Sequence, residues 1–504
     1  MGAADQARGR RPALGPHRRP SRRIDLSDPA VVRVVPDVPT FAVDDGFAYE
    51  VPDTVEVDVG SIVRVPLGGR RVRGWVVGTG APRRPGLRRL LGRSGDLPVF
   101  DARLLQTLRW AAAHYVAPLA ALLSKAGPPN LPKRRAAPRF PDIPDPGPSP
   151  LPEITDAASG GGRLRAHAVV GDLRDPAALA ALTAGVLVAG RSVLLVAPTV
   201  VEAGAIAASL GERLPGRVLV GGSDRAAADA TRDWSLAAGH PGHVVVGTRE
   251  VAFWPVSGLA LAVVLGEGRR GMKDKATPTT HAVDVLARRA GVERFTLVTA
   301  DLVPTATTIA RGPVAVAVPG GRPWGLVEVV DRNDDPPGSG LLSDRTRQAV
   351  SAVVRDGGRV LLFTTRRGGA ARCVRCRTLR TCGACGARPG TGDACPRCGE
   401  AVGPCLSCGG RRFEGLGAGV GRISAEVGGF VGRDAVGEPA AARPVVVGTE
   451  RDLADLDPVD LSVIVDADGP MLAPHYRASE DALRIFARVV ALAGRGRGRR
   501  AIVQ

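Results

Sequence analysis

The sequence contains eight cysteines, and all of them fall into Cys-x-x-Cys pairs within one short segment. Two thiolates at this spacing on a tight turn can hold one edge of a metal ion. Two such turns complete a tetrahedron with Zn–S distances of about 2.3 Å. Glycines that follow the pairs permit the turn backbone. The pairs are Cys373/Cys376, Cys382/Cys385, Cys395/Cys398 and Cys405/Cys408.

This pattern predicts two structural zinc ions per chain, each held by four thiolates with no coordination position left for water. Disulfides are the alternative in secreted chains, but no apolar segment near the N-terminus indicates a secretion signal. An iron–sulfur cluster usually shows less regular cysteine spacing. Four pairs can combine in three ways, and the spacing alone does not choose among them.

The chain is strongly basic, with a net charge of +18 and a pI of about 10.7. This balance favours a polyanionic partner, because each Lys or Arg that pairs with a phosphate releases counterions. We expect nucleic acid, although part of the arginine excess also fits a high-GC genome. Aromatic residues make up only 4% of the chain, which argues against a base-stacking groove along its whole length. The longest apolar stretch, Ala177 to Ala189, is too short to span a membrane.

Several segments of different predicted secondary structure follow one another along the chain and must position these groups. Strand-like segments over 31–78 predict a small β-rich domain, and 101–125 predicts a helix. Many prolines then predict an extended linker. Apolar strands and alanine-rich helices alternate over 165–310, which predicts a doubly wound α/β unit, and a second α/β block brackets the cysteines. The expected strands are Ser192–Ala197, Arg217–Val220, His243–Val246, Leu261–Leu265 and Phe295–Val298, followed by Arg359–Phe363, Pro444–Val447 and Leu461–Val465.

Short motifs at intervals over residues 31–504 are weak singly and specific as a set. They are Phe47-Ala48-Tyr49 with Pro52, Gly247-Thr248-Arg249, Phe363 to Gly368, Asp466-Ala467-Asp468, and Pro474 to Glu480. In that order they resemble the F-D-Y-x-x-P, G-T-R-S-A-x-F, F-x-N-R-R-G, D-A-D and P-D-F-R-A-x-E segments of the PriA family. These are primosomal replication-restart proteins related to superfamily 2 helicases. The chain resembles a degenerate, actinobacterial-type member.

The resemblance implies a multidomain α/β fold. It has an N-terminal β-rich DNA-binding domain, a winged-helix segment and two RecA-like helicase lobes, with a two-zinc module inserted in the second. It also implies that the first and fourth cysteine pairs share one zinc ion, and the second and third pairs the other. The expected boundaries are 1–28 for a disordered basic tail, 29–96 for the β domain that binds 3′ ends in the family, 97–135 for the winged-helix-like segment, 136–160 for the Pro-rich linker, 161–318 for the first lobe, 319–372 and 411–504 for the second, and 373–410 for the zinc module.

The motor motifs of the family are degraded in this chain. A P-loop needs Gly-x-x-x-x-Gly-Lys-[Ser/Thr], whose lysine reaches the phosphates and whose hydroxyl holds Mg²⁺. In register with it, Asp175 replaces the lysine and Pro176 the hydroxyl, after Gly171 and Arg174. The Mg²⁺-holding Asp-Glu-Glu-His becomes Gly266-Glu267-Gly268-Arg269. Neither Gly-Lys-Ser nor Gly-Lys-Thr occurs in the chain, so we expect ATP hydrolysis and unwinding to be lost.

The resemblance places DNA contacts in the N-terminal domain. Phe47 and Tyr49 flank Ala48, where the family has an aspartate in a pocket for the 3′ end of a nascent strand. The alanine puts recognition of a free 3′-OH in doubt. A basic run, Arg70-Arg71-x-Arg73, follows in the same domain. We expect these arginines to bind phosphates without reading base sequence.

We therefore expect a replication-restart protein that binds stalled or branched DNA forks. It would promote primosome assembly and reloading of the replicative helicase without helicase activity of its own. The alternatives are a weakly active ATP-dependent 3′–5′ DNA helicase and a zinc protein unrelated to DNA. The expected cofactor is Zn²⁺, two per chain, with ATP not hydrolysed. The expected partners are forked, single-stranded or duplex DNA, other primosome proteins, and the replicative helicase or its loader, in the cytoplasm at the nucleoid and away from membranes.

Overall fold

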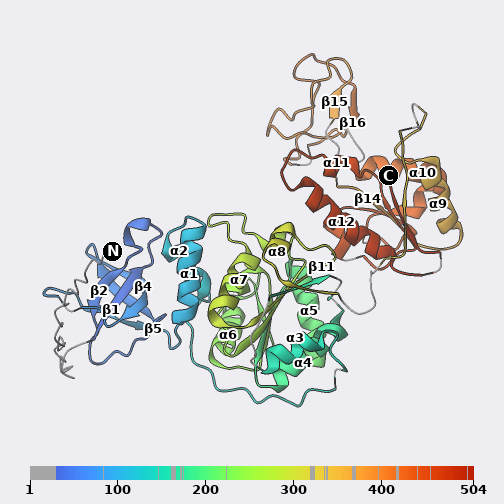
Figure 1. The fold of residues 1–504 in the computed structure, drawn as a ribbon. Helices are drawn as coiled ribbons and strands as arrows, with labels where there is room; N and C mark the ends of the chain where they lie inside the picture. The colour runs from blue at the N-terminus through green and yellow to red at the C-terminus, as the bar shows by residue number, and fades with distance from the viewer. Residues whose placement is uncertain are drawn as a thin grey trace, which may run out of the picture.

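The computed structural model of the protein describes residues 30–504 except 83, 146, 161–165, 171–172, 174, 223, 318–323, 334, 337–338, 366–370, 396, 416–418, 440, 455 and 497. The basic tail expected at 1–28 therefore lies outside the described residues. The chain forms an N-terminal β domain, two α/β lobes and a small cysteine-containing module attached to the second lobe (Figure 1).

The N-terminal domain is built on an antiparallel sheet in the order β2-β1-β4-β3-β5. Valines dominate its central strands, as expected for a half-buried pleated surface. Gly68 and Gly69 form the turn between β3 and β4 with φ of 54° and 77°, a conformation in which other residues are strained. The strands are β1 (Val31–Pro36), β2 (Phe47–Glu50), β3 (Ile62–Leu67), β4 (Arg70–Thr79) and β5 (Gly92–Ser94).

Two helices, α1 (Ala102–His114) and α2 (Leu119–Ala126), lie between this sheet and the first lobe (Figure 1). One continuous apolar core contains Trp75 of the sheet, both helices and Trp234 of the first lobe. The buried Trp234 indole donates to the Ala126 carbonyl at 2.9 Å. The N-terminal domain and the first lobe are therefore packed together and not merely tethered.

Residues 97–135, all of which are described, hold these two helices and no strand, so the winged-helix interpretation of this segment stays a prediction. The extended linker is shorter than expected, because Pro152–Gly160 forms helix α3. Proline is tolerated in a first helical turn, where its missing N–H has no partner to lose. Ile154 and Ala158 of α3 are buried in the core of the first lobe.

The first lobe is a seven-stranded parallel sheet in the order β12-β6-β11-β10-β7-β9-β8. Its strands are apolar and, where their burial is described, almost entirely buried, because helices cover both faces. The strands are β6 (Ala166–Val170), β7 (Ser192–Val196), β8 (Val218–Gly221), β9 (Val244–Gly247), β10 (Leu259–Leu265), β11 (Thr296–Asp301) and β12 (Val314–Ala317). The helices are α4 (Pro176–Val188), α5 (Val200–Arg213), α6 (Ala227–Gly239), α7 (Ala282–Glu293) and α8 (Ala306–Ala310), with 3₁₀ turns η2 (Arg249–Phe253) and η3 (Arg270–Met272).

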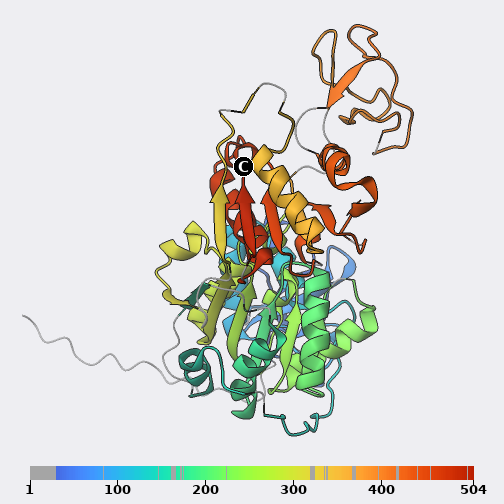
Figure 2. The same cartoon turned by 90° about the vertical axis from the view of Figure 1, so that its right-hand side faces the viewer.

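The second lobe is a six-stranded parallel sheet in the order β13-β20-β19-β14-β18-β17. It stacks above the first lobe, and the cysteine module projects from it (Figure 2). No helix in the described part of the chain is long and apolar enough to cross a membrane. The strands are β13 (Leu326–Val329), β14 (Val360–Phe363), β17 (Val436–Gly437), β18 (Val445–Gly448), β19 (Leu461–Ile464) and β20 (Arg500–Val503). The helices are α9 (Asp344–Arg355), α10 (Val420–Val431), α11 (Asp468–Met471) and α12 (Ala478–Ala493); β15 (Ala371–Cys373) and β16 (Phe413–Gly415) pair at the base of the module.

Candidate functional site

The hairpin of β3 and β4 presents an arginine-rich surface. Arg71 and Arg73 lie on the same face of β4 as Trp75, because side chains alternate along a strand. Arg64 of β3 pairs directly with Arg73 across the two strands. Like charges in such a pair destabilise a sheet by roughly 0.2–1 kcal/mol. A bound polyanion would neutralise the two arginines and so remove this repulsion.

None of the arginines of this hairpin has a carboxylate within ion-pair distance among the described residues. Arg64, Arg70 and Arg71 are exposed, and the Arg73 guanidinium lies 5.5 Å from the centre of the Trp75 ring. We call Arg64, Arg70, Arg71 and Arg73 the hairpin arginines. Their positive charge is uncompensated within the domain, as expected for a phosphate-binding surface.

The two aromatic residues predicted to contact DNA have different environments. Phe47 lies on β2 and is 41% exposed, so its ring is accessible. Tyr49 is only 3% exposed, and its hydroxyl donates to the Pro66 carbonyl at 3.3 Å. Burial raises the pKa of Tyr49 above its usual range. Tyr49 therefore packs within the sheet, and its contact with DNA stays a prediction.

Ala48 lies opposite Arg33 of β1 and leaves the family's aspartate position uncharged. Nearby acids have other partners. The Asp44 carboxylate accepts the first backbone N–H of α2 at 2.9 Å, and the Glu50 carboxylate pairs with Arg89 at 3.3 Å.

A cavity of about 640 Å³ lies beside this position, between β1, the 3₁₀ turn η1 (Phe41–Val43) and α1. Arg33 and Arg109 contribute cations to its wall, Asp44 and Asp45 contribute carboxylates, and Phe41 contributes an exposed ring. Its size falls in the range of small-ligand pockets. The N-terminal domain thus retains a hollow beside its arginine surface.

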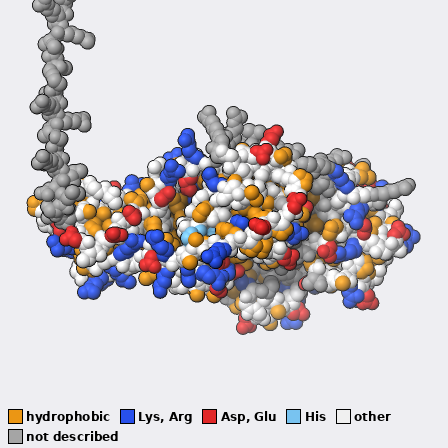
Figure 3. All heavy atoms as spheres, turned by 90° about the horizontal axis from the view of Figure 1, so that it is seen from below, with side chains coloured by type: hydrophobic (Ala, Val, Ile, Leu, Met, Phe, Trp, Pro, Cys, Tyr) orange, Lys and Arg blue, Asp and Glu red, His pale blue; other side chains and the backbone are white. Residues whose placement is uncertain are grey.

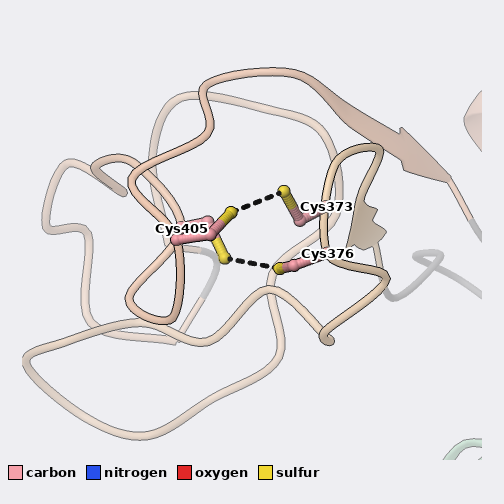
Figure 4. Close-up of side chains that lie close together, drawn as sticks. Cys373, Cys376 and Cys405 are labelled. Carbon is pink, nitrogen blue, oxygen red and sulfur yellow. Dashed lines mark hydrogen bonds between the residues drawn. The ribbon is translucent and has the colours of Figure 1, made fainter.

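The eight cysteines form two quartets, in each of which the Sγ atoms lie within 4.8 Å of one another. Paired sulfurs are 3.5–3.7 Å apart, and Figure 4 shows the Cys376–Cys405 contact. A disulfide needs about 2.05 Å, whereas a ZnS₄ tetrahedron with bonds of about 2.3 Å has edges of about 3.8 Å. The quartets therefore fit metal sites, in the grouping that the resemblance implied. They are Cys373, Cys376, Cys405 and Cys408, and Cys382, Cys385, Cys395 and Cys398.

The turn backbone at each pair explains the glycines. The residue four positions after the first cysteine donates its N–H to that cysteine's carbonyl at 2.8–3.0 Å. This residue adopts positive φ in all four turns, and it is Gly386, Gly399, Gly409 or Arg377. Three of the turns therefore use the residue that adopts this conformation without strain.

Arg380 joins the parts of the module, although no pattern in the sequence indicated this role. The side chain is 5% exposed, and it donates to the carbonyls of Gly390, Gly392 and Val402 at 2.7–2.8 Å. Its guanidinium also lies 4.3 Å from the centre of the Phe413 ring on β16. Arg380 therefore fixes the loop that carries the inner cysteines to the base of the module.

In the quartet that contains Cys376 and Cys408, the pKa values of these two thiols are shifted in opposite directions. The Thr378 hydroxyl and backbone N–H lower the pKa of Cys376 to about 6. The Gly410 N–H favours the Cys408 thiolate, but the neighbouring thiols of Cys376 and Cys373 raise the pKa of Cys408 to about 12. Four thiolates this close repel one another unless a cation is bound. Metal binding at this quartet should therefore release protons.

Two of the predicted nucleotide-site residues, Gly171 and Arg174, lie outside the described residues. Asp175 caps α4, and its carboxylate accepts the Ala177 N–H at 3.1 Å. Pro176 is the first residue of that helix. A helix N-terminus normally attracts phosphate, but here a carboxylate already accepts one of its N–H groups.

Glu267 turns its carboxylate into the first lobe. It accepts the Thr305 N–H at 2.8 Å and the Thr308 hydroxyl, and it is 2% exposed. Burial raises the pKa of Glu267 above its usual range. Gly266 before it has φ of 64° and brings no carboxylate. Among the described residues, the two cysteine quartets are the only groups of three or more ligands close enough to hold a metal ion.

Residues of both lobes line a cleft between them, and an ion pair joins the lobes there. Arg484 of α12 lies 3.6 Å from the Asp301 carboxylate at the end of β11, and both side chains are about 5% exposed. A Cβ at Gly268 would lie 1.9 Å from the Arg484 guanidinium carbon. Glycine at 268, a departure from the family motif, therefore leaves room for an arginine of the second lobe, and Asp301 pairs with that arginine. We call Arg484 and Asp301 the cleft ion pair.

The space left in the cleft is small. Arg269 donates to both oxygens of Glu202 at 2.5 and 2.6 Å. Among the described residues, a cavity of about 30 Å³ remains there, room for a water molecule. It is lined by Leu173, Pro198, Glu202, Leu265, Gly266, Arg269, Ala300, Asp301, Leu302 and Arg488.

Comparison with protein families identifies the N-terminal region. Residues 33–128 match the family model of the PriA 3′ DNA-binding domain. The N-terminal domain is therefore similar to the 3′ DNA-binding domain of the PriA family. The matched range of the 3′ DNA-binding domain runs past residue 96, where the sequence analysis ended the β domain, and includes α1 and α2. These helices share the core of the sheet.

Solved structures similar to 71–80% of the chain are remote in sequence, and no curated protein matches the chain. A DEAD box protein from Methanococcus jannaschii is 9% identical, with a TM-score of 0.29 over 71% of this chain and 86% of that one. The DUF1998 helicase MrfA bound to DNA is 10% identical, with a TM-score of 0.38 over 73% and 52%. RecG bound to a three-way DNA junction is 13% identical, with a TM-score of 0.38 over 80% and 49%.

In the N-terminal domain, the structure brings Arg64 to Arg71 and Arg73, which the sequence analysis singled out. The sequence analysis did not single out Arg64, but a signal was present. A two-residue turn at Gly68 and Gly69 pairs residues equally distant from it, and Arg64 and Arg73 are such a pair.

Proposed function

We propose that this protein binds branched DNA at replication forks through its 3′ DNA-binding domain and promotes reassembly of the replication machinery without hydrolysing ATP. The observation that carries the proposal is the PriA-type 3′ DNA-binding domain over residues 33–128, with its uncompensated hairpin arginines. Its action would be to hold a fork and present it to other primosome proteins and to the replicative helicase or its loader.

The electrostatics of the chain support DNA as the partner. The net charge is +18, and Lys and Arg side chains are spread over the N-terminal domain and the neighbouring part of the first lobe (Figure 3). Contacts of this kind go to phosphates and carry no base sequence information. Such a surface suits recognition of a fork by its shape.

The cleft between the lobes supports a role without ATP hydrolysis. The capping carboxylate of Asp175, the inward-facing Glu267 and the cleft ion pair occupy the places where a motor would hold phosphates and Mg²⁺. Removing even one donor or cation that stabilises a transition state costs orders of magnitude in rate. Here several such groups are replaced together.

The cysteine quartets would each hold a Zn²⁺ ion as a structural site. The sulfur spacing fits tetrahedral zinc, and four thiolates leave no position for substrate. Zinc would fold the module, since metal binding free energy is folding free energy in such domains. We propose that the folded module is the surface for the loading partner.

Equilibrium binding of the full chain to a labelled fork with a free 3′ end tests the proposal. Arg64→Gln and Arg73→Gln should each weaken binding and reduce the slope of log K against log salt by about one. Arg355→Gln, at an exposed arginine of α9 in the second lobe, is the matched control and should change neither. If the wild-type chain binds the fork no better than an acidic protein of equal size does, the proposal fails.

The alternative is a weakly active 3′–5′ helicase, which the two parallel-sheet lobes and their cleft favour. DNA-stimulated ATP turnover distinguishes the two. Turnover that Glu267→Gln abolishes would belong to this protein and support the helicase. Turnover that remains in that variant and falls with purification would be contamination.

A further inference from the structure

The cleft ion pair joins two elements that are each anchored in their own lobe. Asp301 ends β11, which lies between β6 and β10 in the parallel sheet of the first lobe. Arg484 lies on α12, whose apolar side chains Phe486 and Val489 are buried in the core of the second lobe. Close-packed elements of this kind transmit strain to their neighbours. The contact therefore ties the two lobes together and not only two side chains.

The surroundings of Arg484 hold its guanidinium in the cleft. One of its Nη atoms lies 3.6 Å from the Asp301 carboxylate, and the other lies 3.5 Å from Asp481, one turn earlier on the same helix. The guanidinium also fills the space beside Gly268, since a Cβ there would lie 1.9 Å from its central carbon. The first lobe is therefore shaped to receive an arginine of the second.

A second arginine of α12 enters the same cleft. Arg488 lies one turn after Arg484, and its side chain is 3.7 Å from Glu450 of the second lobe. Arg488 lines the small cavity of the cleft together with Asp301 of the first lobe. Burial raises the pKa of Asp301, and the positive charges of Arg484 and Arg488 oppose this rise. Two cations of the second lobe therefore act on one carboxylate of the first.

Other contacts extend this connection on both sides of the first lobe. Arg477, just before α12, donates to the Thr307 hydroxyl of α8 at 3.3 Å. On the other side, the first lobe shares one apolar core with the N-terminal domain, where the Trp234 indole donates to the Ala126 carbonyl. While the cleft ion pair is intact, the N-terminal domain and both lobes would therefore move as one unit.

Proteins with two lobes commonly close around a ligand that contacts both of them. The ligand holds the lobes closed because it binds the closed state more tightly than the open one. In this chain, Arg484 supplies such a bridging contact from within the protein. A side chain is always present at a high effective concentration, so this bridge needs no ligand in solution.

We propose that the cleft ion pair is an internal lock, which holds the two lobes closed whether or not a nucleotide is present. The proposal goes beyond the proposed function, because it concerns the motion of the lobes and applies whether or not the chain binds a fork. Locked lobes do not open and close in a cycle. They form a rigid support that joins the N-terminal domain to the second lobe.

The distance between the two lobes in the full chain tests the lock. Spin labels carried on unnatural amino acids at Val188 of α4 and Arg355 of α9 leave the cysteines untouched, and both positions are exposed. Pulsed electron paramagnetic resonance should give one narrow distance distribution. Mg²⁺ with a non-hydrolysable ATP analogue should leave it unchanged. A distance that shortens when the analogue is added would overturn the proposal, since the nucleotide would then close the lobes.

Arg484→Gln should add a second population with longer distances. Its loss leaves the Asp301 charge buried unless the lobes open, so the ratio of open to closed molecules should rise by roughly 100-fold. Arg484→Lys keeps the positive charge and should retain more of the closed population. Arg499→Gln is the matched control, because Arg499 pairs with Asp460 at 3.4 Å within the second lobe. This variant should leave the distance distribution unchanged.

Gly268→Ala disrupts the lock from the first lobe and should also open the lobes, so the test does not depend on one variant. Metal content and the circular dichroism spectrum should match the wild type in every variant, which separates opening from unfolding. An unchanged distribution in both Arg484→Gln and Gly268→Ala would overturn the lock. A wild-type chain that keeps the narrow distribution and fails to bind the fork would support the lock and overturn the proposed function.

Discussion

The cleft ion pair makes a specific energetic prediction. At 3.6 Å the attraction between Arg484 and Asp301 is about 5 kcal/mol for an effective dielectric constant of about 20. Desolvation of both groups offsets part of this attraction. Removing one partner of a buried pair still costs about 3–5 kcal/mol, because the other charge is left buried. Arg484 also lies 3.5 Å from Asp481 of its own helix, so part of its charge stays paired when Asp301 is replaced. Arg484→Gln and Asp301→Asn should each lower stability, and the double variant should lose less than the sum.

The urea midpoint of the full chain measures this coupling, and midpoints are compared because a multidomain chain does not unfold in two states. Salt should change the effect little, since the pair is buried. Arg355→Gln is again the exposed-arginine control. Gly268→Ala should mimic Arg484→Gln, because its Cβ would occupy the guanidinium's place. Additive losses from Arg484→Gln and Asp301→Asn would refute the reasoning.

The remaining predictions concern the zinc module, the first lobe and the N-terminal core. Cys376→Ser should reduce the metal content from two ions per chain to one in elemental analysis, and Arg380→Ala should speed metal release to a chelator, because the module loses three hydrogen bonds. His243 has a folded pKa lowered to about 4, chiefly by burial, so between pH 6.5 and 4 the unfolded chain binds more protons. The free energy of unfolding should therefore fall by at most about 3 kcal/mol as the pH is lowered from 6.5 to 4. In urea titrations, His243→Leu should lessen this fall, whereas His475→Leu should not. Tyr49→Phe should cost about 1 kcal/mol through the lost hydrogen bond and leave fork affinity unchanged, and a weaker fork affinity would show that Tyr49 contacts DNA after all.

Sequence patterns predicted those turns and strands that depend only on residues close together in the chain. The cysteine spacing specifies tight turns and metal-ligand chemistry directly. The strand predicted at Ser192–Ala197 is confirmed as β7, because five buried apolar residues in a row give a strong signal. β6 and β13 were not predicted, since four or five residues interrupted by His167 or Glu328 carry too weak a pattern.

Contacts between distant segments could not be predicted from the same patterns. Nothing near Arg484 in the sequence indicates that it reaches Asp301 in the other lobe, because packing of the lobes decides that meeting. Phe47 and Tyr49 share one face of β2 by the period of two, and the sequence treats them alike. The apolar core of the N-terminal domain buries Tyr49, whereas Phe47 stays exposed to solvent.

ATP turnover of the purified full chain at saturating forked DNA tests the central claim most directly. We predict stable complex formation with the fork and a turnover that is indistinguishable from that of the Glu267→Gln variant. Turnover well above that variant, stimulated by the fork, would contradict a fork-binding protein with an inactive cleft.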